Sequence, residues 1–142
     1  MARKIIKAEE LDVSKIAAKI RDRRNEVFEV IFSIEDWLRQ VDIIDDFWYE
    51  DIASRTFVGV TCASVHRSVR LVWKVGRDGT PRVLRDSSTA DLARVSLLIP
   101  SMLMALGASM RELEASIVAA SRSLADIRSM TGVHLPKPPG QD

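Results

Sequence analysis

The sequence predicts an α+β fold in which two long amphipathic helices flank a small three-stranded antiparallel sheet, in the order α-β-β-β-α. Apolar residues recur with a heptad period in the first third of the chain and again in the last third. Between these stretches, residues 55–86 are rich in β-branched and aromatic side chains, which favour strands. An Asp78-Gly79 pair between two of the strand-like runs is typical of a β-hairpin.

The first helix is expected to begin near Asp12 or Ser14, because both residues are good N-caps. Two neighbouring apolar rows then form the stripe of a helix that buries one face, although Arg23 and Arg24 interrupt it. The helix either continues to about Ala53 or breaks near Gln40, where Asp42 would cap a short second helix. The first row is Val13, Ile20, Val27, Ile34 and Val41, and the second is Ile16, Val30, Trp37 and Ile44, with Ile31 and Leu38 one step further round the helix.

Three strands are expected at residues 56–62, 68–75 and 82–85. A three-residue turn with a bulge at Gly79, which would take the positive-φ position, pairs Trp73 with Val83. That register gathers Arg70, Lys74 and Arg82 on one face and Trp73, Val75 and Val83 on the other. A four-residue loop would place basic and apolar side chains on the same face. We favour the first register, because the register of a strand pair follows its buried face.

The last helix is expected over 89–131, with Ser88 or Thr89 as its cap, a kink at Pro100 and Gly132 as its stop. Its length from Leu92 to Met130 would be about 58 Å. A compact monomer of this size is only about 40 Å across, and an eight-residue strand covers about 26 Å. The excess of apolar helix predicts a homo-oligomer, most simply a dimer, against the alternative of ordinary core packing. The expected seam is Ile99, Met102, Leu103, Leu106, Met110, Leu113, Ile117 and Leu124.

Composition restricts the class of protein further. The 142 residues suit one domain at 12–131, with a flexible arm at 1–11 and a Pro-rich tail at 132–142. The net charge of +1 argues against a protein that coats DNA, and the single cysteine excludes an internal disulfide. The longest uncharged run, 95–110, is shorter than a membrane span, and the N-terminus lacks the apolar core of a signal peptide. We therefore expect a cytoplasmic protein without a membrane partner.

Charge is sorted along the chain although it nearly cancels overall. Residues 12–54 carry eleven acids against six bases, and residues 55–86 carry seven bases against two acids. The basic side chains pair with the acidic first helix, or they bind a nucleotide or nucleic acid. The candidate anion-binding residues are His66, Arg70, Lys74 and Arg82. Stacking aromatics are missing from this set, because Trp73 is expected on the opposite face.

Three aromatic residues among acids, Phe47, Trp48 and Tyr49, form a candidate protein-docking spot at the end of the first helix. Cys62 and His66 are four residues apart on a strand, about 13 Å, which is too far for a catalytic dyad.

Two acidic pairs give the only sign of metal chemistry. Glu26-x-x-Glu29 and Asp42-x-x-Asp45-Asp46 each place carboxylates on one side of a helix, as a magnesium site could require. Over residues 26–46 they resemble the acidic motifs of MazG-like nucleotide pyrophosphatases, and the resemblance implies a Mg-dependent nucleotide phosphohydrolase. That family has glutamate where this chain has Asp42, and it is all-helical.

The sequence contains no P-loop, G-x-G-x-x-G, C-x-x-C or G-x-S-x-G motif. The expected function is therefore a non-enzymatic interaction module, an adaptor, inhibitor or chaperone-like subunit, with no cofactor and no metal. Its partners would be a second copy of itself and another protein. The architecture is similar to that of prefoldin-type chaperone subunits. The alternatives are the phosphate-ligand binder and, third, the phosphohydrolase.

Overall fold

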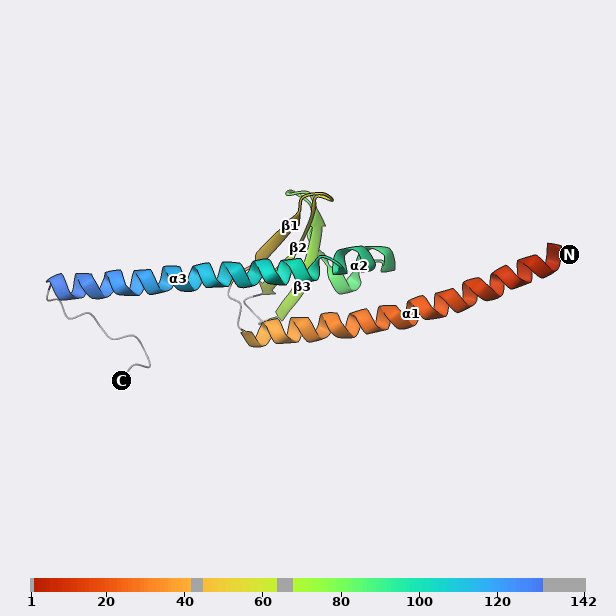
Figure 1. Cartoon of the computed structure of the whole chain (residues 1–142), viewed down its shortest axis with the longest axis horizontal. Helices are drawn as coiled ribbons and strands as arrows, with labels where there is room; N and C mark the ends of the chain where they lie inside the picture. The colour runs from red at the N-terminus through yellow and green to blue at the C-terminus, as the bar shows by residue number, and fades with distance from the viewer. Residues whose placement is uncertain (1, 42–44, 64–67, 132–142) are drawn as a thin grey trace. The chain divides into compact units, whose positions relative to one another are not determined.

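The computed structural model describes residues 2–41, 45–63 and 68–131, and it confirms the α+β class (Figure 1). Helix α1 (Ala2–Val41) is followed by strands β1 (Phe47–Asp51), β2 (Thr56–Ala63), β3 (Ser68–Val75) and β4 (Arg82–Val83). A 3₁₀ turn, η1 (Leu84–Asp86), leads into helices α2 (Thr89–Ser96) and α3 (Ile99–Thr131). The chain forms two compact units, Met1–Met102 and Leu103–Asp142.

Helix α1 begins at Ala2, well before the predicted start at Asp12 or Ser14. It ends at Val41, which agrees with the predicted break near Gln40. Both predicted alternatives, one helix to about Ala53 or a short second helix capped by Asp42, are wrong over residues 47–51, because Phe47–Asp51 is a strand. The apolar heptad rows suggested that helix continues past Val41, but aromatic side chains favour a pleated surface, and β2 offers a partner strand.

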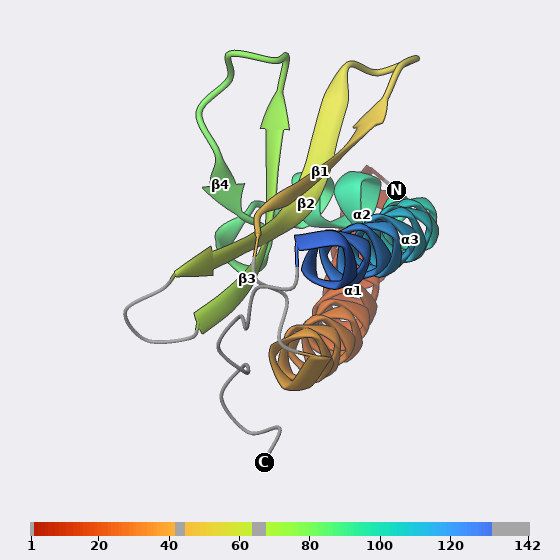
Figure 2. The same cartoon turned by 90° about the vertical axis from the view of Figure 1, so that its left-hand side faces the viewer.

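The sheet therefore has four strands, in the order β1-β2-β3-β4, and all neighbours are antiparallel (Figure 2). Strand β1 pairs with β2 so that Phe47 lies opposite Val60 and Tyr49 opposite Val58. Strand β2 pairs with β3 along its full length, from Thr56 opposite Val75 to Ala63 opposite Ser68. The turn between β1 and β2 holds Arg55 at a positive φ of 53°, and its carbonyl accepts a hydrogen bond from Gly76 N–H at 2.9 Å.

The predicted β3–β4 register is wrong by one residue. Val72 lies opposite Val83 and Trp73 opposite Arg82, so the four-residue loop is the one that forms. The positive-φ residue is Gly76, at 76°, whereas Gly79 is required for space: a Cβ there would lie 2.2 Å from the Val75 carbonyl oxygen. Strand β4 is only two residues long, so placing basic and apolar side chains on the same face here costs little free energy.

The core lies on the sheet face that contacts α1 and α2. Alternate residues of β2 and β3, namely Val58, Val60, Leu71 and Trp73, are buried on this face. The helices contribute Ile31 and Leu38 of α1 and Leu92 and Val95 of α2 to the same buried core. Leu84, Ile99 and Met102 are also buried.

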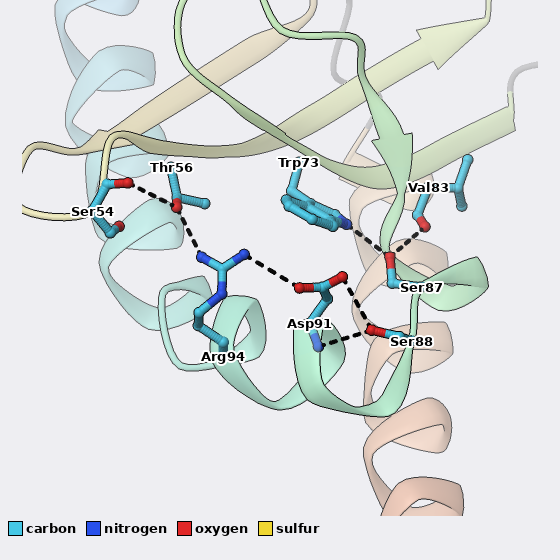
Figure 3. A network of polar contacts seen from close by, with 8 residues as sticks. All are labelled: Ser54, Thr56, Trp73, Val83, Ser87, Ser88, Asp91 and Arg94. Atoms are coloured by element: carbon cyan, nitrogen blue, oxygen red, sulfur yellow. Dashed lines mark hydrogen bonds and ion pairs between the residues drawn. The ribbon is translucent and has the colours of Figure 1, made fainter.

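Helix α2 is attached to the sheet by a polar network (Figure 3). Ser88 is the N-cap, as predicted, and its Oγ accepts a hydrogen bond from Asp91 N–H at 3.2 Å. Arg94 donates to Oγ1 of the fully buried Thr56 at 2.9 Å. Trp73 Nε1 donates to Ser87 Oγ at 2.7 Å, and that hydroxyl donates onward to the Val83 carbonyl at 3.1 Å. These bonds satisfy the indole N–H of a nearly buried tryptophan.

The predicted single last helix is divided into α2 and α3 by the turn residues Leu97 and Leu98. Pro100, expected to kink the helix, is the second residue of α3. A proline is tolerated there because first-turn N–H groups have no intrahelical partner. Gly132, the predicted stop, and the tail at 132–142 lie outside the described residues.

Candidate functional site

Helix α3 carries a long stripe of exposed apolar side chains. From Ala108 to Met130 every described residue is exposed, the large apolar ones included. Leu113 is 56% exposed, Ile117 60% and Leu124 59%. A 33-residue helix is about 50 Å long. A contiguous apolar stripe that is exposed along such a helix marks a candidate association surface.

The predicted seam divides into two parts. Ile99, Met102 and Leu106 are buried and Leu103 is half-buried, so the beginning of the seam does not offer a free surface. Met110, Leu113, Ile117 and Leu124 are exposed. Ala120 and Ile127 continue the same row, which alternates steps of three and four residues, as the a and d positions of a coiled coil do. We call Met110, Leu113, Ile117, Ala120, Leu124 and Ile127 the α3 seam.

A second apolar stripe runs along α1. The buried face of this helix carries Ile31 and Leu38, which the predicted stripe included, together with Glu35; most of the two main heptad rows lie beside this face. Val13, Ile16, Ile20, Val30, Trp37 and Val41 are all exposed. Val30, Ile34 and Trp37 line a shallow pocket of about 380 Å³ with Glu29 and Ser33. Ile16, Ile20 and Val27 line another, of about 280 Å³, with Leu92 and Ala93 of α2.

The second face of the sheet carries basic and aromatic side chains together. Lys74 Nζ lies 4.7 Å from the ring centre of Trp48 and 5.3 Å from that of Phe57. Arg70 is on the same face by alternation along β3. No stacking aromatic was predicted on this face, because β1, which carries Trp48, was not predicted as a strand. We call Trp48, Phe57, Arg70 and Lys74 the outer-face cluster.

Arg82, a member of the predicted anion-binding set, does not join this cluster. Arg82 lies opposite Trp73 and its guanidinium is 5.6 Å from the Trp73 ring centre, so it is on the helix-facing side of the sheet. This correction follows directly from the one-residue change of register. His66 lies outside the described residues.

The docking triplet is not one patch. Phe47 and Tyr49 point toward the face that bears Val60 and Val58, whereas Trp48 points to the other and lies against Gly59. A Cβ at position 59 would be 2.0 Å from the Phe47 carbonyl oxygen and 3.0 Å from Trp48 Cε3. Glycine at this position allows the ring to lie across β2.

A polar pocket of about 450 Å³ lies where β4 ends and the edge of β3 is left open. Glu35 of α1 covers this edge: its Oε2 accepts a hydrogen bond from Leu71 N–H at 2.8 Å. The residue is only 6% exposed, and its Oε1 has no hydrogen-bond partner within the described structure. Burial raises the pKa of Glu35 above its usual value, against the opposing effects of the Leu71 N–H and Arg85. No sequence pattern indicates this residue, since an acid on an acidic helix predicts a solvated position.

The acidic pairs are separated in the structure. Glu26 and Glu29 are exposed on α1, whereas Asp45 and Asp46 follow the helix, and Asp46 accepts a hydrogen bond from Cys62 N–H at 2.9 Å. Asp42 lies outside the described residues. Within the described part of the chain, no three His, Cys, Asp or Glu residues gather as a metal site would require.

The ion pairs at Arg23, Arg39 and Arg94 are local, each joining a carboxylate three residues away in the same helix. They do not link the basic sheet to the acidic first helix.

No single helix among the described residues is long and apolar enough to cross a membrane, although α2 and α3 taken as a bent pair pass the same test of length and composition. No family model, curated protein or solved structure matches this chain.

Proposed function

We propose that this protein is a non-enzymatic interaction module that functions as a homo-oligomer assembled through its long helices. The observation that supports the proposal is the α3 seam, an apolar heptad row in which Leu113, Ile117 and Leu124 are each more than half exposed. Apolar burial is worth roughly 25 cal/mol per Å², so leaving such a row in water forfeits a large stabilisation. A second copy is the partner that is always present at equal concentration.

The composition of the stripe supports the same conclusion. Contiguous exposed apolar rows on a protein surface mark association sites more often than isolated apolar residues do. The residues beside the α3 seam, such as Ser109, Ser116 and Ser123, are small and uncharged. They would allow another helix to approach closely without burying an unpaired charge.

The experiment is light scattering coupled to size-exclusion chromatography on the full chain over a wide range of concentrations. The expected mass is at least twice the 15.9 kDa of one chain. Ile117→Glu should reduce the mass to that of one chain, because it introduces a carboxylate into the middle of the seam. Ala115→Glu, on the same helix but outside the seam, is the matched control and should leave the assembly intact. A wild-type chain that remains at 15.9 kDa at high concentration would refute the proposal.

A second candidate function is the binding of a phosphorylated ligand such as a nucleotide, and the outer-face cluster favours it. Trp48 and Phe57 supply the stacking groups that nucleic-acid readers combine with cations such as Lys74 and Arg70. Lys74 Nζ also donates to the Arg77 carbonyl at 2.9 Å, which holds the ammonium group near the rings.

Tryptophan fluorescence can test this second function with single-stranded oligonucleotides and mononucleotides as probes. Salt-sensitive quenching should disappear in Lys74→Ala and in Trp48→Phe, while Arg77→Ala, in the adjacent turn, should behave as wild type. The absence of quenching across the panel of probes would remove this candidate.

A further inference from the structure

We propose that the polar pocket between α1, β3 and η1 binds a small oxyanion, such as inorganic phosphate or the phosphate group of a small metabolite, through the guanidinium groups of Arg70 and Arg85. We call it the edge pocket. Its volume of about 450 Å³ is within the range of small-ligand sites. The inference goes beyond the proposed assembly, and the edge pocket shares only Arg70 with the outer-face cluster.

Three separate elements bring cations to the edge pocket. Arg39 comes from α1, Arg70 from β3 and Arg85 from η1. Arg70 and Arg85 are half-buried, and none of the ion pairs among the described residues involves either of them. Charged groups that are withdrawn from water are normally paired, and the guanidinium fork matches an oxyanion. Two such groups beside one cavity therefore favour an anion as their partner.

Packing and backbone geometry prepare the pocket for this ligand. Arg85 Cζ lies 5.4 Å from the ring centre of Phe32, which also lines the pocket, and a guanidinium stacked on a ring keeps its N–H edge free. Ser68 adds a hydroxyl to the same lining. Val69 N–H points to the same side as Leu71 N–H, because backbone groups alternate along a strand. Strand β4 ends before this point, so no described strand covers Val69 on this side.

The two carboxylates of the pocket are engaged elsewhere. Asp36 accepts hydrogen bonds from Arg39 and, at 3.2 Å, from Gln40 Nε2, so this acid accounts for the α1 arginine. Glu35 is bound to Leu71 N–H at 2.8 Å. Burial has the largest effect on the pKa of Glu35 and raises it, which favours the neutral form of the side chain. The arginines of β3 and η1 are left for a ligand.

Sulfate is the probe for the test, because its charge does not change between pH 5 and pH 8. It is titrated into the isotope-labelled full chain at constant ionic strength, replacing chloride, and followed by NMR. The backbone amides of Ser68, Val69 and Arg70 should shift and reach saturation. Arg85→Gln should weaken binding by about tenfold or more, because it removes a charge-assisted hydrogen bond. Arg77→Gln, an exposed arginine in the turn after β3, should bind sulfate like the wild type.

Two further variants separate binding from a change of fold or of site. Lys74→Ala, in the outer-face cluster, should keep sulfate binding at the edge pocket. Glu35→Gln should bind sulfate more tightly than the wild type, and the gain should be larger at pH 8 than at pH 5. The reason is that the wild-type carboxyl is more fully ionised at high pH and then repels the anion, whereas a damaged fold would only weaken binding. The charged groups that act on Glu35 or line the pocket with it stay unchanged in this variant: Asp36, Arg39, Arg70, Arg85 and Asp86.

Competition identifies the source of the oxyanion. Inorganic phosphate and a sugar phosphate are each added against bound sulfate, and displacement by either that is lost in Arg85→Gln supports the proposal. Absence of saturable shifts in the wild type would overturn it. Binding that survives in Arg85→Gln but is lost in Lys74→Ala would also overturn it, because the anion would then sit at the outer-face cluster. The mass from light scattering tests the homo-oligomer independently, so the two proposals can fail separately.

Discussion

Glu35 shows how one side chain can close a sheet edge that the chain itself leaves open. Strand β4 ends at Val83, so no strand accepts the Leu71 N–H, and the Glu35 carboxylate takes the place of the missing carbonyl. Unpaired edge groups invite association with other strands, and covering them with a helix side chain prevents it. Placing a carboxylate in a nearly buried position raises its pKa, because burial penalises the charged form.

This leads to a pH-dependent prediction. The raised pKa means that the folded state binds the proton of Glu35 more tightly than the unfolded state does. The stability contributed by this group is therefore present below its ordinary pKa and is lost as pH rises through the raised value. Glu35→Gln keeps an acceptor for Leu71 N–H but has no charge to bury. The difference in free energy of unfolding, variant minus wild type, should increase from pH 4 to pH 8.

Urea denaturation across this range measures that difference. Arg85 and Asp86, whose charges act on Glu35, and Asp36, Arg39 and Arg70, which line the pocket with it, are unchanged in the variant. Glu29→Gln, on the exposed side of the same helix, should show no such trend. A difference that shrinks as the pH rises would contradict this assignment.

The second residue-scale prediction concerns Ser87. Its hydroxyl is the acceptor for the indole N–H of Trp73, which is only 3% exposed. Ser87→Ala should cost about 1–3 kcal/mol, because it leaves a buried donor without a partner. Combined with Trp73→Phe, the losses should be less than additive, since the second change removes the unsatisfied donor. Ser33→Ala, an exposed hydroxyl on α1, should change stability by less than about 0.5 kcal/mol. Strict additivity in the double variant would rule out this coupling.

At the scale of the elements, two glycines have opposite roles. Gly59 allows β1 to lie close to β2 with Trp48 across it, whereas nothing lies within 4 Å of a Cβ placed at Gly107 of α3. The first glycine is required by contact with a neighbouring strand. The second only lowers the helical propensity of α3.

Alanine at each position therefore gives opposite results. Gly59→Ala should destabilise the protein by about 1–3 kcal/mol or more, because the new methyl group forces β1 away from β2. Gly107→Ala should stabilise it by about 0.5–1 kcal/mol, because alanine loses less backbone entropy in a helix. Denaturation midpoints in urea, with circular dichroism as the signal, measure both. A stable Gly59→Ala protein would show that the close packing of β1 on β2 is not needed.

At the scale of the whole molecule, the balance of apolar surface is the dominant feature. The buried core holds Ile31, Leu38 and the inner residues of β2 and β3, while apolar residues along much of α1 and α3 remain exposed. The core alone therefore stabilises only part of the helical length. Under the proposed assembly, the stability of the rest is linked to association and therefore depends on protein concentration.

Thermal unfolding should show this linkage. If unfolding is coupled to dissociation of a dimer, each tenfold rise in concentration adds about 1.4 kcal/mol to the apparent stability, and the melting temperature rises with it. Ile117→Glu should melt at a temperature that does not depend on concentration, and Ala115→Glu should follow the wild type. A melting temperature that is constant for the wild-type chain would indicate that no assembly stabilises α3.

The sequence by itself determined what depends on local pattern. The heptad period of the last helical stretch is a property of neighbouring residues, and so is the cap of α2 at Ser88, which was one of the two predicted caps. The predicted kink at Pro100 is instead a break at Leu97 and Leu98, ahead of the first turn of α3. The amphipathic stripes were also visible, together with the excess of apolar helix over what one sheet can cover.

Only the tertiary structure decided what depends on residues distant in sequence. Strand β1 exists because β2 is beside it, and the β3–β4 register follows a four-residue loop that local pattern did not favour. The outer-face cluster and the role of Glu35 follow from those pairings, because Trp48 meets Lys74 across the sheet and Glu35 meets an edge that β4 leaves open. Local periodicity fixes which face of an element is apolar, but the neighbour of that face is chosen by packing among all the elements together.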